Sequence, residues 1–301
     1  MKTAIVTGAT GFIGTHLCNE LLANDIEVKA CIRRNGGDTK RLSGAVDIVE
    51  CGMDEYDSLN NISADYFFHL AWEGATGPGR DDELLQAKNV YRTIAAFQAA
   101  KRAGCKRFVA LGTVYENFVP QILREKEHRK VDFYLLAKQN AHLMCKKLSA
   151  KLDMEFVWVT IFQPIGRYIK REQVMSYVIN GLLKGEAPEF GPAMEPYDIT
   201  AVEDIAYGLR LLGESSSLSR QEYYIGSGKP MLMKDYLEQI KKVLQSDTEL
   251  KIGARPDDGL RFSYDWYDIS AIEKDTGYSV KTGFDKAVLN VADWIMSGEQ
   301  I

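Results

Sequence analysis

The stretch Thr7-Gly8-Ala9-Thr10-Gly11-Phe12-Ile13-Gly14 directly follows the apolar run Lys2-Thr3-Ala4-Ile5-Val6 at the start of the chain. That run is short and rich in β-branched residues, which is typical of a buried strand. The residues from Phe12 to Ala23 then place apolar side chains at helical spacing. Together the two segments predict a strand, a tight turn and a helix.

Three glycines, spaced three residues apart, indicate what this turn binds. Gly8 lets the chain reverse, Gly11 leaves no Cβ between the backbone and a pyrophosphate, and Gly14 lets the helix pack close to the strand. The helix N-terminus offers unpaired amide N–H groups and a partial positive charge to phosphates. A glycine-rich turn without a ligand is the alternative, but the flanking strand and helix favour a dinucleotide site. The candidate cofactor contacts are Gly8, Thr10, Gly11, Phe12, Ile13 and Gly14.

The composition is that of an ordinary globular protein and argues against several classes of function. Hydrophobic residues make up 46% of the chain, and 37 Lys and Arg against 42 Asp and Glu leave no basic excess for nucleic acid. Apolar runs such as 156–162 are too short to span a membrane, and a strand that starts at Lys2 leaves no room for a signal peptide. Five Cys without a Cys-x-x-Cys pair indicate reduced thiols in a cytoplasmic protein, and four His without ligand spacing predict no metal.

Strand patterns alternate with helical patterns, which predicts an α/β fold with a doubly wound parallel sheet. Ligands of such sheets bind beyond the carboxyl ends of the strands. We expect residues 1–163 to form the cofactor domain, with 201–225 returning to it, and residues 164–200 and 226–301 to form a smaller C-terminal substrate-binding lobe. The later expected strands are 27–32, 46–50, 66–70, 107–111 and 155–161, and the later expected helices are 82–103, 133–151 and 284–295.

The end of the second strand bears on the choice between NAD and NADP. In dinucleotide-binding folds an acidic residue near this point holds the ribose 2′-hydroxyl of NAD. Here Ile32 stands near that position, and Arg33 and Arg34 follow it. A carboxylate would repel a 2′-phosphate, whereas a guanidinium binds it with paired hydrogen bonds. The sequence therefore favours NADP(H) with Arg33 as the contact; NAD, with Arg33 in a solvated basic turn, is the alternative.

The fourth strand leads from His69 into Leu70, Ala71 and a glycine-rich loop, 73–79. A loop at the carboxyl end of a strand is expected to line the cofactor site, with Leu70 and Ala71 as contacts. His69 is expected to be a core histidine rather than a catalyst. Asn89 is a poor helix former inside a long helix, and we expect it to bridge backbone groups of neighbouring strands beside the cofactor.

Three polar side chains form a candidate catalytic group. The strand 107–111 leads into Thr113, and the helix 133–151 carries Tyr134 and Lys138 one turn apart on one face. A nearby ammonium favours the phenolate, so Lys138 is expected to lower the pKa of Tyr134 from about 10 towards the range useful for proton transfer. Thr113, at the end of its strand, is expected to hydrogen-bond a carbonyl or alcohol oxygen.

On these residues the chain resembles the extended short-chain dehydrogenase/reductases that act on nucleotide sugars, which include epimerases, dehydratases and 4-keto-sugar reductases. Residues 7–14 match the cofactor motif of this family, Tyr134 and Lys138 match its catalytic pair, and Thr113 resembles the Ser/Thr partner. The resemblance covers almost the whole chain. It implies a Rossmann fold in which Tyr134 and Lys138 also contact the cofactor.

Two later segments resemble the substrate-binding side of the family. Phe162-Gln163-Pro164-Ile165-Gly166 resembles the segment that enters the substrate domain, with Gln163 where Asn is common. Arg255-Pro256-Asp257-Asp258 resembles the segment whose Arg contacts the diphosphate of the sugar nucleotide. The resemblance therefore implies substrate contacts by Thr113, Gln163 and Arg255.

The chain also departs from the family's pattern at two points. The Asp that commonly contacts adenine after the third strand is replaced by Gly52, with Asp54 nearby. The Asp-Glu pair that 4,6-dehydratases carry after their Thr is absent, since Thr113 is followed by Val114 and Tyr115. Dehydration needs an acid and a base at the far carbons of the sugar, so the pattern disfavours that activity.

The resemblance and Arg33 together predict an NADP(H)-dependent enzyme that reduces a keto group of a nucleotide sugar, with Tyr134 as the acid. A nucleotide-sugar epimerase that retains NAD is one alternative. A non-catalytic dinucleotide-binding regulator is another, although it would not need Thr113, Tyr134 and Lys138 together. The family resemblance also implies a homodimer formed through the long helices near 82–103 and 133–151.

Overall fold

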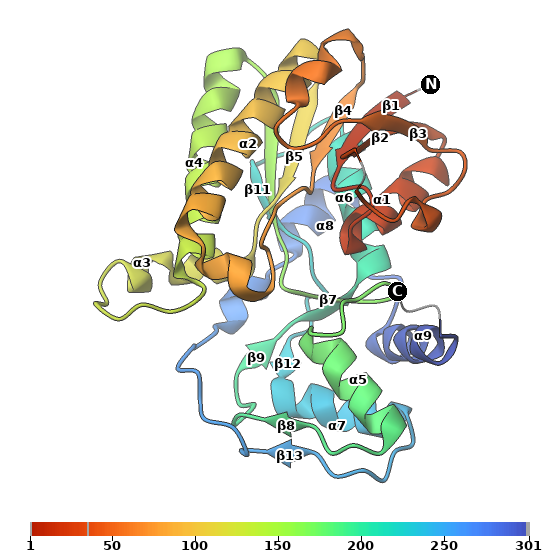
Figure 1. Ribbon diagram of the computed structural model, residues 1–301, viewed down its shortest axis with the longest axis vertical. Helices are drawn as coiled ribbons and strands as arrows, with labels where there is room; N and C mark the ends of the chain where they lie inside the picture. Colours follow the sequence, from red (N-terminus) through yellow and green to blue (C-terminus); the bar gives the residue numbers. More distant parts are fainter. Residues whose placement is uncertain (1, 35, 299–301) are drawn as a thin grey trace. The chain divides into compact units, whose positions relative to one another are not determined.

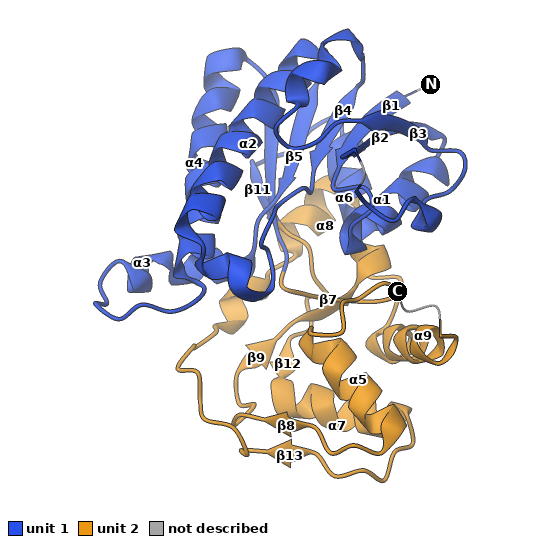
Figure 2. Ribbon diagram, viewed as in Figure 1, with its two compact units in different colours: residues 1–161, 206–223 blue, residues 162–205, 224–301 orange. Residues whose placement is uncertain are grey.

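The computed structural model describes residues 2–34 and 36–298, and the chain divides into two compact units (Figure 2). Unit 1 comprises Met1–Ile161 and Ala206–Tyr223, and unit 2 comprises Phe162–Ile205 and Tyr224–Ile301. The chain therefore leaves unit 1 after Ile161, returns to it for a single helix and strand, and leaves it again after Tyr223.

Unit 1 is built on a seven-stranded sheet (Figure 1). Its strands are β1 (Lys2–Thr7), β2 (Ile26–Ile32), β3 (Asp47–Glu50), β4 (Tyr66–His69), β5 (Arg107–Leu111), β6 (Glu155–Thr160) and β11 (Glu222–Tyr224). Their order is β11-β6-β5-β4-β1-β2-β3, and β1 to β6 pair in parallel. The chain order reverses between β1 and β4, and in such sheets ligands bind beyond the carboxyl ends of the strands at the reversal.

Helices cover both faces of this sheet, which confirms the predicted doubly wound α/β fold. The helices of unit 1 are α1 (Phe12–Leu22), α2 (Glu83–Arg102), α3 (Val119–Ile122), α4 (Asp132–Leu152) and most of α6 (Val202–Glu214). α2 and α4 pack side by side on one face (Figure 1). α6 meets the other face, because Gly213 lies against Phe68 whereas the neighbouring Phe67 belongs to the core under α2 and α4. The predicted strand 107–111 has the observed bounds, and the other predicted strands and long helices differ from the observed bounds by at most one residue at each end.

The core of unit 1 lies between the sheet and the pair α2 and α4. Phe108 is at its centre, with ring centroids 5.4 Å from Phe67, 4.7 Å from Phe97 and 6.5 Å from Phe156. Burying each such ring stabilises the fold by about 1.5–3 kcal/mol. The cluster holds α2 and α4 against the strands and so fixes the polar side chains that these helices carry.

Unit 2 packs α5, α7 and α9 against one another, with pairs of short strands in the same unit (Figure 1). Its helices are α5 (Val174–Lys184), α7 (Met233–Val243), α8 (Ser270–Thr276) and α9 (Phe284–Met296). Its strands pair as β7 (Gln163–Ile165) with β10 (Ile199–Ala201), β9 (Pro196–Tyr197) with β12 (Met231–Leu232), and β8 (Glu189–Phe190) with β13 (Lys251–Ile252). The sequence predicted α9 but not α5 or α7, because those two helices stand among Pro, Gly and charged residues that were interpreted as loops.

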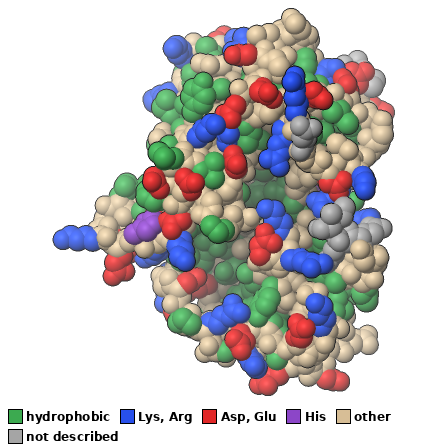
Figure 3. All heavy atoms as spheres, in the orientation of Figure 1, with side chains coloured by type: hydrophobic (Ala, Val, Ile, Leu, Met, Phe, Trp, Pro, Cys, Tyr) green, Lys and Arg blue, Asp and Glu red, His purple; other side chains and the backbone are tan. Residues whose placement is uncertain are grey.

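The charged side chains on the surface and the cysteines do not indicate a particular ligand. On the face shown in Figure 3, acidic and basic side chains are interspersed. All five cysteines are free and buried in unit 1. Within the described residues, no helix has the length and apolarity needed to cross a bilayer, and no group of three or more His, Cys, Asp or Glu could hold a metal ion.

Candidate active site

The loop between β1 and α1 has the geometry that the three glycines predict. Gly8 adopts φ +70°, and a Cβ there would lie 2.8 Å from the amide nitrogen of Ala71. The amide of Gly11 donates to the carbonyl oxygen of Gly8 at 2.9 Å, and Gly11 is the N-cap of α1. A Cβ on Gly14 would collide with the same Gly8 oxygen. The loop is thus a bare backbone cradle at a helix N-terminus, which fits the pyrophosphate of a dinucleotide.

The carboxyl end of β4 lies directly against this cradle. The backbone of Leu70 and Ala71 contacts Gly8, and the amide of Ala71 donates to the hydroxyl of Thr7 at 3.3 Å. His69 is buried between the hydroxyls of Thr7 and Thr93, at 2.9 and 3.2 Å. Burial lowers the pKa of His69 to about 3, with the charge of Lys138 acting in the same direction. His69 is therefore a neutral core residue, as the sequence indicated.

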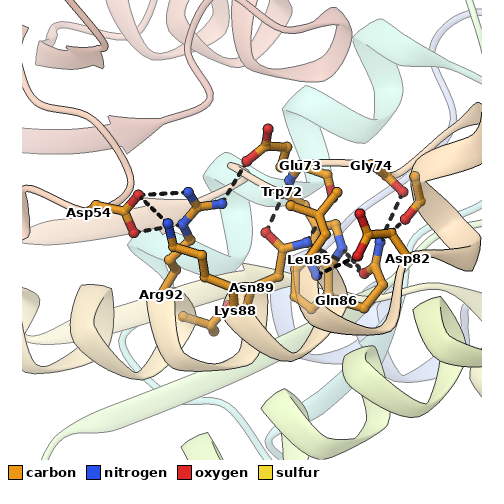
Figure 4. A network of polar contacts seen from close by, with 12 residues as sticks. Asp54, Trp72, Glu73, Gly74, Asp82, Leu85, Gln86, Lys88, Asn89 and Arg92 are labelled. Atoms are coloured by element: carbon orange, nitrogen blue, oxygen red, sulfur yellow. Dashed lines mark hydrogen bonds and ion pairs between the residues drawn. The ribbon is translucent and has the colours of Figure 1, made fainter.

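A network of polar contacts fastens the loop after β4 onto α2 (Figure 4). Asn89 donates to the carbonyl oxygen of Glu73 at 2.7 Å and accepts from its amide at 3.2 Å. Gln86 accepts from the indole N–H of Trp72 at 2.9 Å and donates to the carbonyl of Gly79 at 2.7 Å. The prediction that Asn89 bridges neighbouring strands is wrong, because both backbone bonds go to one residue in the loop. Whether Asn89 also contacts the cofactor stays a prediction.

Arg92 extends this network towards the third strand (Figure 4). Its buried guanidinium binds both carboxylate oxygens of Asp54, at 2.9 and 2.7 Å, and reaches the carboxylate of Glu73 at 2.7 Å. The hydrogen bond from Arg92 holds the pKa of Asp54 well below its usual range, and Lys88 adds to the effect. Asp54 therefore stays ionised, and its carboxylate is bound by Arg92 and Lys88 of α2.

Thr113 and Lys138 lie near the carboxyl end of β5, and Tyr134 is one turn before Lys138 on α4, which packs against the short helix η4 (Val114–Phe118). Thr113 is the buried N-cap of η4, and Lys138 donates its Nζ to the carbonyl oxygen of Leu111, the last residue of β5, at 2.8 Å. The ring of Trp72 lies between the two helical residues: the Lys138 Nζ is 3.7 Å from its centroid, and the Tyr134 ring meets it edge-on at 6.2 Å. Trp72 therefore packs against both members of the pair.

The predicted lowering of the Tyr134 pKa by Lys138 is wrong for this arrangement. Burial raises the pKa of Tyr134 above its usual value, and the cation that opposes this is Arg80, whose Cζ is 5.1 Å from the ring centroid. Burial lowers the pKa of Lys138. The Lys138 ammonium contacts the carbonyl oxygen of Leu111 and the ring of Trp72. The helical spacing of Tyr134 and Lys138 alone therefore did not predict which groups this charge affects.

Three residues of this site were not identified from the sequence: Trp72, Arg80 and Glu116. Trp72 belongs to the loop after β4, Arg80 to the short helix η3 (Gly77–Asp81) that follows it, and Glu116 to η4. The Glu116 carboxylate accepts from the amide of Thr113 at 2.7 Å and closes a capping box with it. The spacing of Thr113 and Glu116 is the one sequence signal that could have identified this contact.

Arg33 follows β2 and is exposed to solvent. Within the described part of the chain its guanidinium makes no ion pair, whereas Arg34 pairs with Glu50 at 3.3 Å. A Cβ on Gly37 would lie 2.6 Å from the hydroxyl of Thr10, so the segment after Arg33 passes against the glycine loop. Arg33 is therefore an unpaired cation at the carboxyl edge of the sheet.

Unit 2 contains a pocket of about 440 Å³ that includes Arg255 in its lining. The Arg255 guanidinium donates to the hydroxyl of Tyr177 at 3.2 Å, whereas Arg261, also in the lining, is paired with Asp257 at 2.6 Å. Arg255 makes no ion pair with any described residue, so it is the lining cation available to an anion. Gln163 lies in β7, in register with Ile199, and is not part of this lining.

Comparison with known proteins gives a consistent result. The model of the NAD dependent epimerase/dehydratase family matches residues 4–226. CDP-abequose synthase of Salmonella muenchen is 22% identical over 84% of this chain and 84% of its own. The structure of UDP-N-acetylglucosamine 4-epimerase from Methanobrevibacter ruminantium, in complex with UDP-N-acetylmuramic acid, superposes with a TM-score of 0.83 at 24% identity, covering 99% of each chain. The structure of UDP-glucuronic acid 4-epimerase from Bacillus cereus, in complex with NAD, superposes with a TM-score of 0.78 at 19% identity. The match covers 99% of this chain and 97% of that one.

Proposed function

Because this chain belongs to the NAD dependent epimerase/dehydratase family, whose model covers residues 4–226, we propose that it transfers hydride between a nicotinamide dinucleotide and the sugar of a nucleotide sugar. The observation that carries this proposal is the grouping of Thr113, Tyr134 and Lys138 near the carboxyl end of β5, in the unit that holds the glycine cradle. A panel of nucleotide keto-sugars, assayed for oxidation of NADPH or NADH by the purified protein, tests it.

Each residue of the group has a distinct task in the proposed reaction. The nicotinamide, when bound, supplies the hydride. Tyr134 donates its phenolic proton to the oxygen of the keto group, and Thr113 donates a hydrogen bond that orients the same oxygen. Lys138 holds the nicotinamide ribose and is itself oriented by Leu111 and Trp72. Burial raises the pKa of Tyr134, so the phenol is protonated at neutral pH, as an acid must be, but it is a weaker acid than a phenol whose pKa lies near the working pH.

We propose net reduction with NADP(H) as the specific reaction. Arg33 supports NADP(H), because its exposed guanidinium has no ion pair with a described residue and precedes the segment that passes against the glycine loop, which suits a 2′-phosphate. Net reduction usually draws on NADPH, which links the cofactor to the reaction by analogy.

Replacing Arg33 with Ala should separate the two cofactors. We expect the Kd for NADPH to rise by about 10- to 100-fold, since one or two charge-assisted hydrogen bonds are lost, and the Kd for NADH to change little. Fluorescence titration of both cofactors measures this. Arg34→Ala is the matched control, because Arg34 is already paired with Glu50. An equal loss for NADPH and NADH would contradict the assignment of Arg33.

An epimerase that retains NAD is the second candidate, and the similarity to the epimerase from Methanobrevibacter ruminantium favours it. Such an enzyme oxidises and re-reduces one carbon and keeps its cofactor between turnovers. The nucleotide released on denaturing the freshly purified protein distinguishes the two reactions. Stoichiometric NAD would support the epimerase, and a protein that binds and releases NADPH reversibly would support the reductase.

We further propose that the pocket of unit 2 holds the diphosphate of the nucleotide sugar through Arg255. Replacing Arg255 with Ala is expected to weaken the binding of UDP or CDP by about 10-fold or more, because the anion loses its unpaired cation. Calorimetric titration with each nucleotide measures the loss, and Lys251→Ala provides an exposed cationic control outside the lining. Unchanged affinity for both nucleotides would remove Arg255 from the site. Gln163 stays a candidate sugar contact.

We also propose a cytoplasmic homodimer. α2 and α4 pack together and expose Leu84, Tyr91, Leu143 and Met144, which would form the contact between subunits. The five free thiols support a reducing compartment. Sedimentation equilibrium of the wild-type protein and of Leu143→Glu tests the dimer.

A further inference from the structure

Arg80 is a cation beside Tyr134 that the proposed reaction does not yet use. It lies in η3, and its Cζ is 5.1 Å from the centroid of the Tyr134 ring. That distance is within the roughly 6 Å over which a guanidinium interacts with the face of an aromatic ring. Both residues belong to unit 1, so the fold of one unit brings them together.

The charge of Arg80 is not neutralised by a neighbouring carboxylate. Its Nε donates to the carbonyl oxygen of Ala75 at 2.7 Å, and among the residues that the structure describes its guanidinium makes no ion pair. The two carboxylates that follow it in the chain have other partners. Asp81 contacts the imidazole of His128 at 2.6 Å, and Asp82 caps the N-terminus of α2. The positive charge of Arg80 is therefore available to the adjacent phenol.

The segment that carries Arg80 is fastened to two helices. Gln86 of α2 donates to the carbonyl oxygens of Gly74 and Gly79, at 3.2 and 2.7 Å (Figure 4). η3 also packs against α4, the helix that carries Tyr134. The backbone around Arg80 is thus fixed by contacts that do not involve its guanidinium, so a change of this side chain leaves most of them in place.

Lys138 is the cation that helical spacing assigns to Tyr134, but its ammonium contacts other groups. Its Nζ donates to the carbonyl oxygen of Leu111 at 2.8 Å and lies 3.7 Å from the centroid of the Trp72 ring. Within the described parts of the chain, no hydrogen bond joins Lys138 to Tyr134. The cation that the structure places against the Tyr134 ring is Arg80.

The groups around the phenol act on its ionisation in opposite directions. Burial has the largest effect and raises the pKa of Tyr134, and the positive charge of Arg80 lowers it. Glu116 and Tyr115, both from η4, raise the same pKa further. A buried phenol is a weak acid, so a cation that stabilises its anion makes it a better proton donor.

We propose that Arg80, and not Lys138, supplies the positive charge that stabilises the phenolate of Tyr134 when this residue protonates the substrate. The inference rests on the proposed reduction. In each turnover the substrate carbon gains a hydride from the reduced nicotinamide and its oxygen gains the Tyr134 proton, which leaves a negative charge on the phenolate. The guanidinium keeps its own protons, so it acts by charge alone. The phenolate then recovers one proton from solvent for each alcohol formed.

Arg80 acts through Tyr134 and is therefore a positioning residue, and the choice of variants separates this role from its hydrogen bond to Ala75. Arg80→Gln and Arg80→Met both remove the charge, so one serves if the other does not fold. Arg80→Lys retains a positive charge. Arg102→Gln is the matched control, because Arg102 is the last residue of α2 and pairs with Asp57 at 2.8 Å.

Fluorine NMR titration of the ligand-free protein gives the first readout. Tyr134 is replaced by difluorotyrosine, whose phenol is more acidic than that of tyrosine and whose fluorine signals report this one group. In this background Arg80→Gln and Arg80→Met are expected to raise the midpoint by about one pH unit or more, because the phenolate loses its cation. Arg80→Lys and Arg102→Gln should stay close to the parent, and Lys138→Met should raise the midpoint less than the neutral Arg80 variants.

Three results of this titration would overturn the proposal. The first is an unchanged midpoint in the neutral Arg80 variants. The second is an equal rise in Arg80→Lys, because the position of the side chain and not its charge would then be responsible. The third is a larger rise in Lys138→Met, which would return the role to the lysine.

The second readout is kcat for reduction at neutral pH. Arg80→Gln is expected to lower kcat by about tenfold with little change in KM, because the charge acts on proton transfer and not on binding. In a Tyr134→Phe background the same change should have no further effect, since no phenolate forms. An equal loss in both backgrounds would overturn the proposal. A wild type inactive on every keto-sugar would instead reject the proposed function, and the fluorine titration would still decide the role of Arg80.

Discussion

Replacing Tyr134 with Phe should lower the rate of hydride transfer by about 10²- to 10⁴-fold and leave the fold intact. The change removes one hydroxyl, while the ring keeps its contacts with Trp72 and Arg80. Without the phenolic proton, the oxygen of the substrate must take its proton from water, and positioned general acids contribute about 10²- to 10⁴-fold to the rate. Steady-state kcat with a nucleotide keto-sugar, together with the Kd of the cofactor, measures the effect.

The matched control for this variant is Tyr264→Phe, which removes an exposed hydroxyl from η5 (Tyr264–Tyr267) in unit 2. It should retain wild-type turnover. The account also predicts that reduction by the wild type loses no activity through Tyr134 as the pH rises from neutral to mildly alkaline. Burial raises the pKa of the Tyr134 phenol, so this acid stays protonated throughout that pH range. Full turnover in Tyr134→Phe would show that another group supplies the proton.

Replacing Gly14 with Ala should cost both cofactor affinity and stability. A Cβ at this position would collide with the carbonyl oxygen of Gly8, which is backbone and cannot rotate away. α1 must then move away from β1, so the cradle widens at the point where the pyrophosphate is expected. Overpacking of this kind typically destabilises a fold by about 1–3 kcal/mol.

Cofactor affinity should fall by about tenfold or more, which corresponds to roughly 1.4 kcal/mol of lost interaction. Titration of NADPH fluorescence and urea unfolding monitor the two effects. Gly44→Ala is the control, since a Cβ at Gly44 meets no atom within 4 Å and its φ is not positive. Wild-type affinity in Gly14→Ala would mean that this loop does not bind the pyrophosphate.

Features of the fold and site that depend on nearby residues were predictable from the sequence. The roles of Gly8 and Gly14 follow from the turn between one strand and the next helix, and the structure has the close approaches that they imply. The bounds of the strands and long helices followed from periodicity in the same way. α5 and α7 were missed although both are amphipathic, because the Pro, Gly and charged residues of their segments were interpreted as loops.

Features that depend on distant residues were not predictable. Helical spacing correctly put Tyr134 and Lys138 on one face of α4, but the direction of the ammonium is set by Leu111 and Trp72 from other elements. Asn89 was expected to join strands, yet its amide meets a loop whose path the sequence does not specify. In each case the chemistry depends on a contact between segments far apart in the chain.

The most direct test of the account follows one hydrogen atom. Reduced cofactor carrying deuterium at the transferable C4 position is incubated with the wild-type protein and a panel of nucleotide keto-sugars, and the sugars are analysed by mass spectrometry and NMR. We expect one carbon-bound deuterium in the reduced sugar with the wild type, and about 10²- to 10⁴-fold slower incorporation with Tyr134→Phe. Recovery of every sugar without deuterium, from a protein that binds the cofactor, would contradict it.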